Sequence, residues 1–288
     1  MKIIDPHIHL FNIELGDYHW LKQANPPFWP DKSVISRSFD ETNLTSHSSL
    51  DIAGFVHIEA GFDNKEPWRE LAYLEEHNKL SFKAIAFVDI AKSQTEFISD
   101  ITQLKTYPCL MGVRYILEDI DADFLYQEHV KQNLRELAKQ NLVFEAQFAM
   151  EHTQVVDSLI DILEQDPHFT IVINHHGFCP SDANRYDMWL NNIKRLSAFK
   201  NVYIKCSGQE MLNANNRDID FVRFENIINT CIEVFSRDRV MLASNFPLIT
   251  LSLPYHEYWQ MLHNLFASDK TLWQRLSYQN ARHVYQIT

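Results

Sequence analysis

Two histidines near the N-terminus, His7 and His9, are spaced so that they could act together. They follow Asp5 and Pro6 in the run D-P-H-I-H, directly after the apolar start of the chain. In an extended chain, side chains two residues apart point the same way, so both imidazoles can reach one metal ion. Imidazole is a common ligand of Zn²⁺. The alternative for so short a motif is that both rings are structural and bond to the backbone.

Polar and ionisable side chains also occur at the ends of later apolar segments. Glu59 and His175 each end such a segment, and Arg114 lies within another. Polar groups at these positions are costly to bury unless they are paired or used in chemistry. Carboxylates and imidazoles can transfer protons, and the planar guanidinium of Arg suits a carboxylate or polar oxygen of a substrate. Further side chains of this kind are Gln147, Lys205 and Asn245.

The charged members of this set also have a structural interpretation. Glu59 could form an ion pair with Lys205 or with Arg114, and Arg114 could serve only as such a partner. The sequence leaves both interpretations open.

The segments that must position these side chains form a regular series. Eight short runs of apolar and β-branched residues have centres near positions 4, 56, 85, 113, 145, 172, 204 and 242. Amphipathic segments with helical spacing lie between them, and after the first interval the runs recur about every 30 residues, the length of a strand–helix unit. The series predicts an α/β protein with a (β/α)₈ TIM-barrel fold and a single domain over residues 1–288. An open doubly wound sheet is the alternative, but its Gly-rich first turn is missing.

The interval after the first predicted strand is longer than the others and rich in aromatic residues. Active sites of TIM barrels lie at the carboxyl ends of the strands, where this insertion of residues 11–39 would sit. It could form a lid over the site, with Trp20 against the substrate, or an ordinary packed extension. Its aromatic residues are Phe11, Tyr18, Trp20, Phe28, Trp29 and Phe39.

The composition restricts the partners of the protein. The 288 residues include 26 Lys and Arg against 38 Asp and Glu, which gives a net charge of −12. A negative field repels phosphate backbones and anionic lipid, so no nucleic-acid or membrane partner is expected. The six glycines form neither a dinucleotide fingerprint nor a phosphate-binding loop. A small molecule, anionic or sugar-like, is the expected partner, and a homo-oligomer stays open.

The chain also has the features of a cytoplasmic protein. Its first residues break after two apolar positions and do not read as a signal peptide, and no apolar run approaches the roughly 18 residues of a membrane span. The four cysteines are far apart and are expected to be reduced and buried.

Three motifs and their order along the chain point to a known family. They are D-x-H-x-H at residues 5–9, N-H-x-G at residues 174–177 and S-N-x-P at residues 244–247. Together they resemble the amidohydrolase-2 group of the amidohydrolase superfamily, TIM-barrel hydrolases that include sugar-acid lactonases such as fuconolactonase. The resemblance extends over essentially the whole chain. It implies a divalent metal, with Zn²⁺ as the candidate, although members of the group differ in whether they need one.

The resemblance also implies roles for individual residues. The implied metal ligands are His7, His9, His175 and Glu59. The implied catalytic residues are Glu59, His175 and Asn245, and the expected substrate-binding residues are Arg114, Trp20, Gln147 and Lys205.

Asn245 departs from the pattern of the superfamily. Strand eight there usually ends in an Asp that touches the metal and accepts the proton of the attacking water. An amide has no proton-accepting pKa near neutrality and cannot be this base. Members of the lactonase-like group can carry this Asn, so Glu59 or a metal-bound hydroxide would have to supply the base.

The function expected from the sequence is therefore metal-assisted hydrolysis of a small cyclic ester, the lactone of a sugar acid or a related carboxylate. A decarboxylase of the same superfamily is one alternative. A non-catalytic barrel that binds a sugar acid is another, and Asn245 keeps it open.

Overall fold

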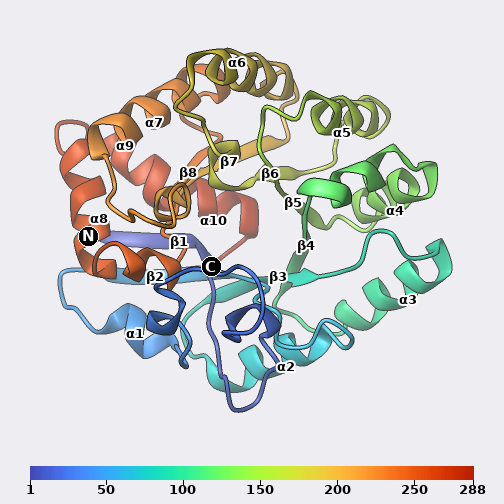
Figure 1. Ribbon diagram of the computed structural model, residues 1–288, viewed down its shortest axis with the longest axis horizontal. Coiled ribbons are helices and arrows are strands. Elements are labelled where there is room, and N and C mark those ends of the chain that lie inside the picture. The colour runs from blue at the N-terminus through green and yellow to red at the C-terminus, as the bar shows by residue number, and fades with distance from the viewer.

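Eight parallel strands form one sheet in the order β1 to β8, which confirms the predicted TIM-barrel fold. The computed structural model describes the backbone of residues 1–288 and the side chains of all of them except residues 119–122. Figure 1 shows the strands at the centre and the helices arranged around them. The strands are β1 (Lys2–Ile8), β2 (Asp51–Ile58), β3 (Phe82–Phe87), β4 (Leu110–Ile116), β5 (Val143–Gln147), β6 (Ile171–Ile173), β7 (Val202–Cys206) and β8 (Val240–Leu242).

The barrel closes between its first and last strands, at the edge that carries two of the predicted site residues. Ile8 forms a parallel bridge with Phe246, and the backbone N–H of Asn245 donates to the carbonyl oxygen of His7 over 3.0 Å. The chemistry-bearing ends of β1 and β8 are therefore fixed to one another by backbone hydrogen bonds.

Helices follow the strands as the amphipathic pattern predicted. Their apolar faces pack on the outside of the barrel, where the outward residues of the strands, such as Phe144 and Ile204, join the main core. Among the described residues, none of the helices is both long and apolar enough to cross a lipid bilayer. The helices are α1 (Glu41–Thr45), α2 (Trp68–His77), α3 (Gln94–Leu104), α4 (Glu128–Lys139), α5 (Thr153–Gln165), α6 (Ala183–Ser197), α7 (Phe221–Phe235), α8 (Tyr255–Leu265), α9 (Lys270–Gln274) and α10 (Asn280–Tyr285).

A second, smaller core fills the inside of the barrel. Inward residues such as Ile4, Val56 and Met241 pack with Val284 and Tyr285 of the C-terminal segment. The C-terminus accordingly lies near the centre of the barrel in Figure 1. This segment plugs one end of the barrel with apolar side chains, so the cavity forms at the other end.

The closing helix contains a π-helical segment. The apolar pattern over residues 272–285 predicted one helix, and helical backbone runs without a break through α9, the π-helix Arg275–Gln279 and α10. A π-helical segment inserts extra backbone into a helix and shifts the faces on either side of it. Here it lets Trp273 join the outer core while Tyr285 enters the barrel.

The insertion after β1 folds back on itself. Phe11 and Phe39 form an antiparallel bridge at its base, and short 3₁₀ turns at His19–Leu21 and Lys32–Val34 shape the loop between them. The ring of Phe11 packs edge-on against Phe39 and Trp20. The insertion is thus an ordered aromatic structure that reaches the mouth of the barrel.

Candidate active site

A cavity of about 600 Å³ lies at the carboxyl ends of the strands. Nearly every strand or the turn after it contributes a side chain, which is the arrangement of active sites in TIM barrels. Its lining is His9, Trp20, Pro27, Trp29, Glu59, Ala60, Gly61, Asn64, Phe87, Arg114, Tyr115, Ile116, Glu118, Gln147, His175, Met211, Asn245 and Leu248.

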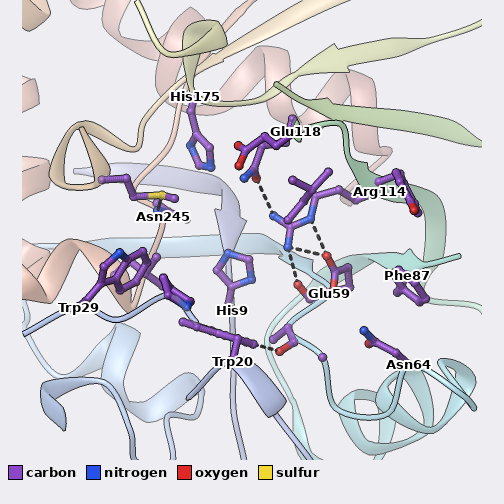
Figure 2. A pocket seen from close by; sticks show the side chains of 18 residues that line it. His9, Trp20, Trp29, Glu59, Asn64, Phe87, Arg114, Glu118, His175 and Asn245 are labelled. Carbon is purple, nitrogen blue, oxygen red and sulfur yellow. Dashed lines mark hydrogen bonds and ion pairs between the residues drawn. The ribbon is translucent and has the colours of Figure 1, made fainter. Parts of the chain in front are cut away.

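Glu59 and Arg114 form a buried ion pair in the wall of this cavity. Arg114 Nε donates to Glu59 Oε1 over 2.8 Å, and Nη2 lies 2.6 Å from the same oxygen. The remaining contacts of the guanidinium are Nη2 to the Glu59 carbonyl oxygen at 2.9 Å and Nη1 to Gln147 Oε1 at 3.2 Å, as the dashed lines of Figure 2 show. All three nitrogens of Arg114 therefore contact protein groups, as in the ion-pair interpretation that the sequence left open. Arg114 also lines the cavity, and its role in substrate binding stays a prediction.

The carboxylate of Glu59 is held by Arg114 through one of its two oxygens. Both side-chain contacts with the guanidinium go to Oε1, and Glu59 lines the cavity. Burial raises the pKa of Glu59 above its usual range, and the charge of Arg114 only partly offsets this effect. A carboxylate with a raised pKa that lines a cavity is a candidate for proton transfer.

Three of the predicted histidines lie together: His9 and His175 line the cavity, and His7 lies beside them, outside the lining. The ring centre of His7 lies 5.2 Å from that of His9 and 4.6 Å from that of His175. His9 Nδ1 must donate its hydrogen to the carbonyl oxygen of Ile58 at 2.8 Å, which leaves Nε2 with a free lone pair. His175 Nδ1 lies 2.9 Å from Ser207 Oγ.

The three rings are neutral at pH 7. Burial lowers the pKa of His7, His9 and His175 well below the usual value. Positive charges nearby act in the same direction, Lys205 most strongly on His7 and Arg114 on the other two. Neutral imidazoles are the form that can bind a metal or accept a proton.

Strained backbone positions two of the site residues. His175 has φ of 52° and Asn245 has φ of 61°, in the left-handed region that non-glycine residues rarely adopt. For this reason β6 ends at Ile173, earlier than the predicted strand, and His175 lies in the 3₁₀ turn Asn174–Gly177. Gly208 makes room for the ring, because a Cβ there would lie 2.6 Å from His175 Nδ1.

Lys205 lies outside the cavity lining, although the sequence predicted that it binds substrate. It points into the barrel, where Nζ lies 2.7 and 2.6 Å from the two carboxylate oxygens of Glu145. Both side chains have an exposed fraction of 0%. Tyr285 Oη donates to Glu145 Oε1 over 2.7 Å. The position of Lys205 fits a structural ion pair below the site.

The sequence also predicted that His7, His9, His175 and Glu59 hold a divalent metal ion. Among the described side chains, no group of three or more His, Cys, Asp or Glu residues is arranged to hold one. Glu59, an expected ligand, is held by Arg114. His7 nevertheless has the chemistry of a metal ligand, because both of its ring nitrogens are buried without a hydrogen-bond partner. The imidazoles therefore suit a divalent metal as neutral nitrogen donors, whereas the carboxylate of Glu59 is already held in an ion pair.

The insertion contributes the aromatic side of the cavity, as Figure 2 shows for Trp20 and Trp29. Trp20 Nε1 donates to the carbonyl oxygen of Ala60 over 2.8 Å, and the two indoles meet edge-on with centres 6.3 Å apart. The loop after β7 supports this side, because Arg217 binds Asp31 of the insertion through two nitrogens at 2.8 and 2.9 Å.

Several residues of the site were not predicted from the sequence. Asn64, Phe87 and Met211 line the cavity, and Glu210 lies behind it against Asn245. Glu210 follows β7 by four positions, and a carboxylate so close to a strand end was a signal that could have been used. The other three have no distinguishing pattern in the sequence.

Known proteins resemble the chain over nearly its full length. The model of the amidohydrolase family Amidohydro_2 matches residues 4–287. The L-fucono-1,5-lactonase of Burkholderia ambifaria is 22% identical over 251 residues, which are 86% of this chain and 84% of that protein.

Solved structures share the fold. An amidohydrolase of Burkholderia multivorans with bound zinc has a TM-score of 0.80 at 17% identity, and all of both chains is covered. A protein of Pseudomonas putida, proposed to be a 2-pyrone-4,6-dicarboxylic acid hydrolase, has a TM-score of 0.69 at 16% identity over 99% of this chain and 97% of that one. Structures of decarboxylases are also among the similar folds, with TM-scores of 0.63 and 0.59, so the fold does not separate these reactions.

Proposed function

Because this chain belongs to the amidohydrolase family, we propose that it is an enzyme that hydrolyses a small cyclic ester, the lactone of a sugar acid. The observation that carries the proposal is the cavity in which Glu59, with its raised pKa, lies among neutral imidazoles and the Asn245 amide. The likeness to a lactonase supports the choice of substrate class. We place the enzyme in the cytoplasm, since its four cysteines are free and buried.

In the proposed reaction Glu59 is the general base and then the general acid. Its carboxylate takes a proton from water while the water oxygen bonds to the lactone carbonyl carbon. When the ring C–O bond breaks, the same proton passes to the leaving oxygen. In the absence of a metal, His175 can donate to the carbonyl oxygen through Nε2, because Nδ1 can accept a hydrogen bond from Ser207 Oγ. The amide oxygen of Asn245 orients the attacking water by accepting its second hydrogen.

The lining favours an uncharged ring with hydroxyl groups. The guanidinium of Arg114 is neutralised by Glu59, and the imidazoles carry no charge at pH 7. A closed sugar-acid lactone has no free carboxylate, and its hydroxyls can bond to Asn64 and Gln147 while Trp20 and Trp29 cover the ring.

We also propose that His7, His9 and His175 are the residues that would hold a divalent metal such as Zn²⁺. The two unpartnered nitrogens of His7 and the zinc in the Burkholderia multivorans structure support this proposal. When bound, Zn²⁺ supplies Lewis acidity toward a carbonyl oxygen and lowers the pKa of water.

We expect His7→Ala to lose zinc. The wild-type protein, incubated with Zn²⁺ and desalted at pH 7.5, should retain about one equivalent of zinc by elemental analysis. The variant should retain far less, because loss of one ligand weakens a metal site strongly. His57→Gln is the matched control, since His57 is equally buried but both of its nitrogens are occupied, by the Leu10 amide and by Glu70. Equal zinc in the His7 variant and in the wild type, or none in either, would contradict the proposed ligands.

We expect Trp20→Ala to raise KM by about 10-fold and to change kcat much less. The indole covers one side of the cavity and makes no contact with the proposed proton donor, so its loss removes uniform binding. Phe28→Ala in the same insertion is the control, since Phe28 is 74% exposed and does not line the cavity. If Trp20→Ala only lowers the melting temperature, Trp20 is a packing residue.

The proposed reaction is tested with a panel of 1,4- and 1,5-lactones of sugar acids. Acid release measured with a pH indicator should exceed the spontaneous rate for at least one lactone, and pyrone dicarboxylates should react more slowly because of their charge. Release of CO₂ from aromatic carboxylates, without hydrolysis of any lactone, would identify the decarboxylase alternative instead.

A further inference from the structure

A buried carboxylate, Glu210, lies directly behind the cavity. It belongs to the 3₁₀ turn Gln209–Met211, which follows β7, and its exposed fraction is 1%. Oε1 accepts a hydrogen bond of 2.6 Å from Asn245 Nδ2. Among the described residues, Oε2 has no hydrogen-bond partner although it is buried.

The nearby cation does not neutralise this carboxylate. Arg217 directs Nη1 to the backbone carbonyl oxygen of Glu210 over 2.7 Å and gives Nε and Nη2 to Asp31. A buried carboxyl group without an ion-pair partner is costly to the fold. Such groups call for an explanation in function.

The contact with Glu210 determines which side of the Asn245 amide faces the cavity. The two hydrogens of Nδ2 are taken by Glu210 Oε1 and by Met211 Sδ, which lies at 3.1 Å. The amide oxygen is left for the other side, where Asn245 lines the cavity. An amide oxygen can accept a hydrogen bond from water but cannot take its proton.

We propose that Glu210 is a positioning residue for the reaction. Its carboxylate anchors the amide of Asn245 with the oxygen toward the cavity, where that oxygen can accept a hydrogen of the attacking water. This inference rests on the proposed function, since the role assigned to Glu210 is a role in that hydrolysis.

The titration of Glu210 supports this role. Burial raises its pKa to about 7, although the hydrogen bond from Asn245 and the charge of Arg217 act in the opposite direction. Tyr258 of α8 is the other titratable group that faces it. Because the folded pKa is raised above that of the unfolded chain, Glu210 favours the folded state at low pH. This advantage is lost as pH rises from about 4.5 to 7.

A double-mutant cycle tests whether Glu210 acts through Asn245. On the lactone hydrolysed fastest, Glu210→Gln should lower kcat by about 10- to 100-fold, the range for a hydrogen bond to a charged group, and should leave KM within about threefold. In the Asn245→Ala background the same substitution should have no further effect. Glu70→Gln removes a buried carboxylate that bonds to Ala60 and His57, not to Asn245, so its effect should be additive with Asn245→Ala.

A stability measurement separates this inference from the proposed function. The melting temperature of the wild type relative to Glu210→Gln should fall as pH rises from 5 to 8. Additive effects in the cycle, or a constant difference in melting temperature, would overturn the role of Glu210. If Glu210→Gln does not fold, the melting temperature of Asn245→Ala is measured over the same pH range instead. Loss of the hydrogen bond to Glu210 should extend the pH-dependent loss of stability above pH 7. An unchanged dependence of the melting temperature on pH would overturn the inference. A wild type with the predicted trend but no lactone hydrolysis would count against the proposed function and not against the Glu210–Asn245 pair.

Discussion

Replacement of Glu59 by Gln should lower kcat by about 10²- to 10⁴-fold at every pH, the usual contribution of a general base. Gln can still accept the hydrogen bonds from Arg114 through its amide oxygen, so the wall of the cavity keeps its shape. The substitution removes only the proton-accepting carboxylate, the group whose pKa is raised by burial. Steady-state kinetics over pH 5–9 on the best lactone measure the effect.

Arg114→Met distinguishes a base from a structural ion-pair partner. The charge of Arg114 lowers the pKa of Glu59, so its removal should raise that pKa further and move the acidic limb of the pH–rate profile to higher pH. Activity of Arg114→Met should therefore recover as pH rises, whereas Glu59→Gln should stay inactive. Equal, pH-independent losses in both variants would mean that Glu59 serves only to hold Arg114.

The barrel could be predicted because its signal is repeated along the chain. Each strand buried on both faces is a short apolar run, and the recurrence of about 30 residues identifies the strand–helix unit. The π-helical segment between α9 and α10 could not be predicted, since the pattern over residues 272–285 indicates a helix but not its hydrogen-bond register. Trp273 and Tyr285 enter different cores, and only tertiary packing decides this.

The residue types of the site could be predicted, but their partners could not. Placement at strand ends correctly brought His9, Glu59 and His175 to one cavity. The partner of Arg114, which could be Glu59 or a substrate, depends on the register of the barrel strands. The direction of Lys205, toward the mouth or the interior of the barrel, depends on how far along its strand the residue lies. Lys205 does not line the cavity, and its ammonium group is fully buried against Glu145, which lies two positions before the cavity residue Gln147 on β5.

The surroundings of Asn245 show a different limit. The sequence indicated that an amide cannot be the base, but the carboxylate that contacts it comes from a loop after another strand. Asn245 and His175 also adopt left-handed backbone, which Asn and His tolerate better than most residues but which the sequence does not locate. Such tertiary constraints have no pattern in a single sequence.

Lys205→Met should destabilise the protein by about 3–5 kcal/mol, because it leaves the carboxylate of Glu145 buried without its cation. Tyr285 would still donate one hydrogen bond to Glu145, but a neutral donor replaces little of a full charge. Urea-induced unfolding followed by circular dichroism measures the loss. KM should stay near the wild-type value, since Lys205 does not line the cavity.

Two further variants show whether the loss comes from the unpaired charge. Lys205→Met combined with Glu145→Gln removes both charges and keeps an acceptor for Tyr285, so most of the lost stability should return. Lys131→Met breaks the more exposed pair with Asp161 and should cost no more than about 1 kcal/mol. A Lys205→Met protein with normal stability and a raised KM would contradict the structural role, and would mean that Lys205 reaches the substrate after all. In that case the Lys205–Glu145 ion pair would belong to the active site. Its full burial and its contact with Tyr285 of the C-terminal segment indicate instead that it stabilises the barrel interior next to His7.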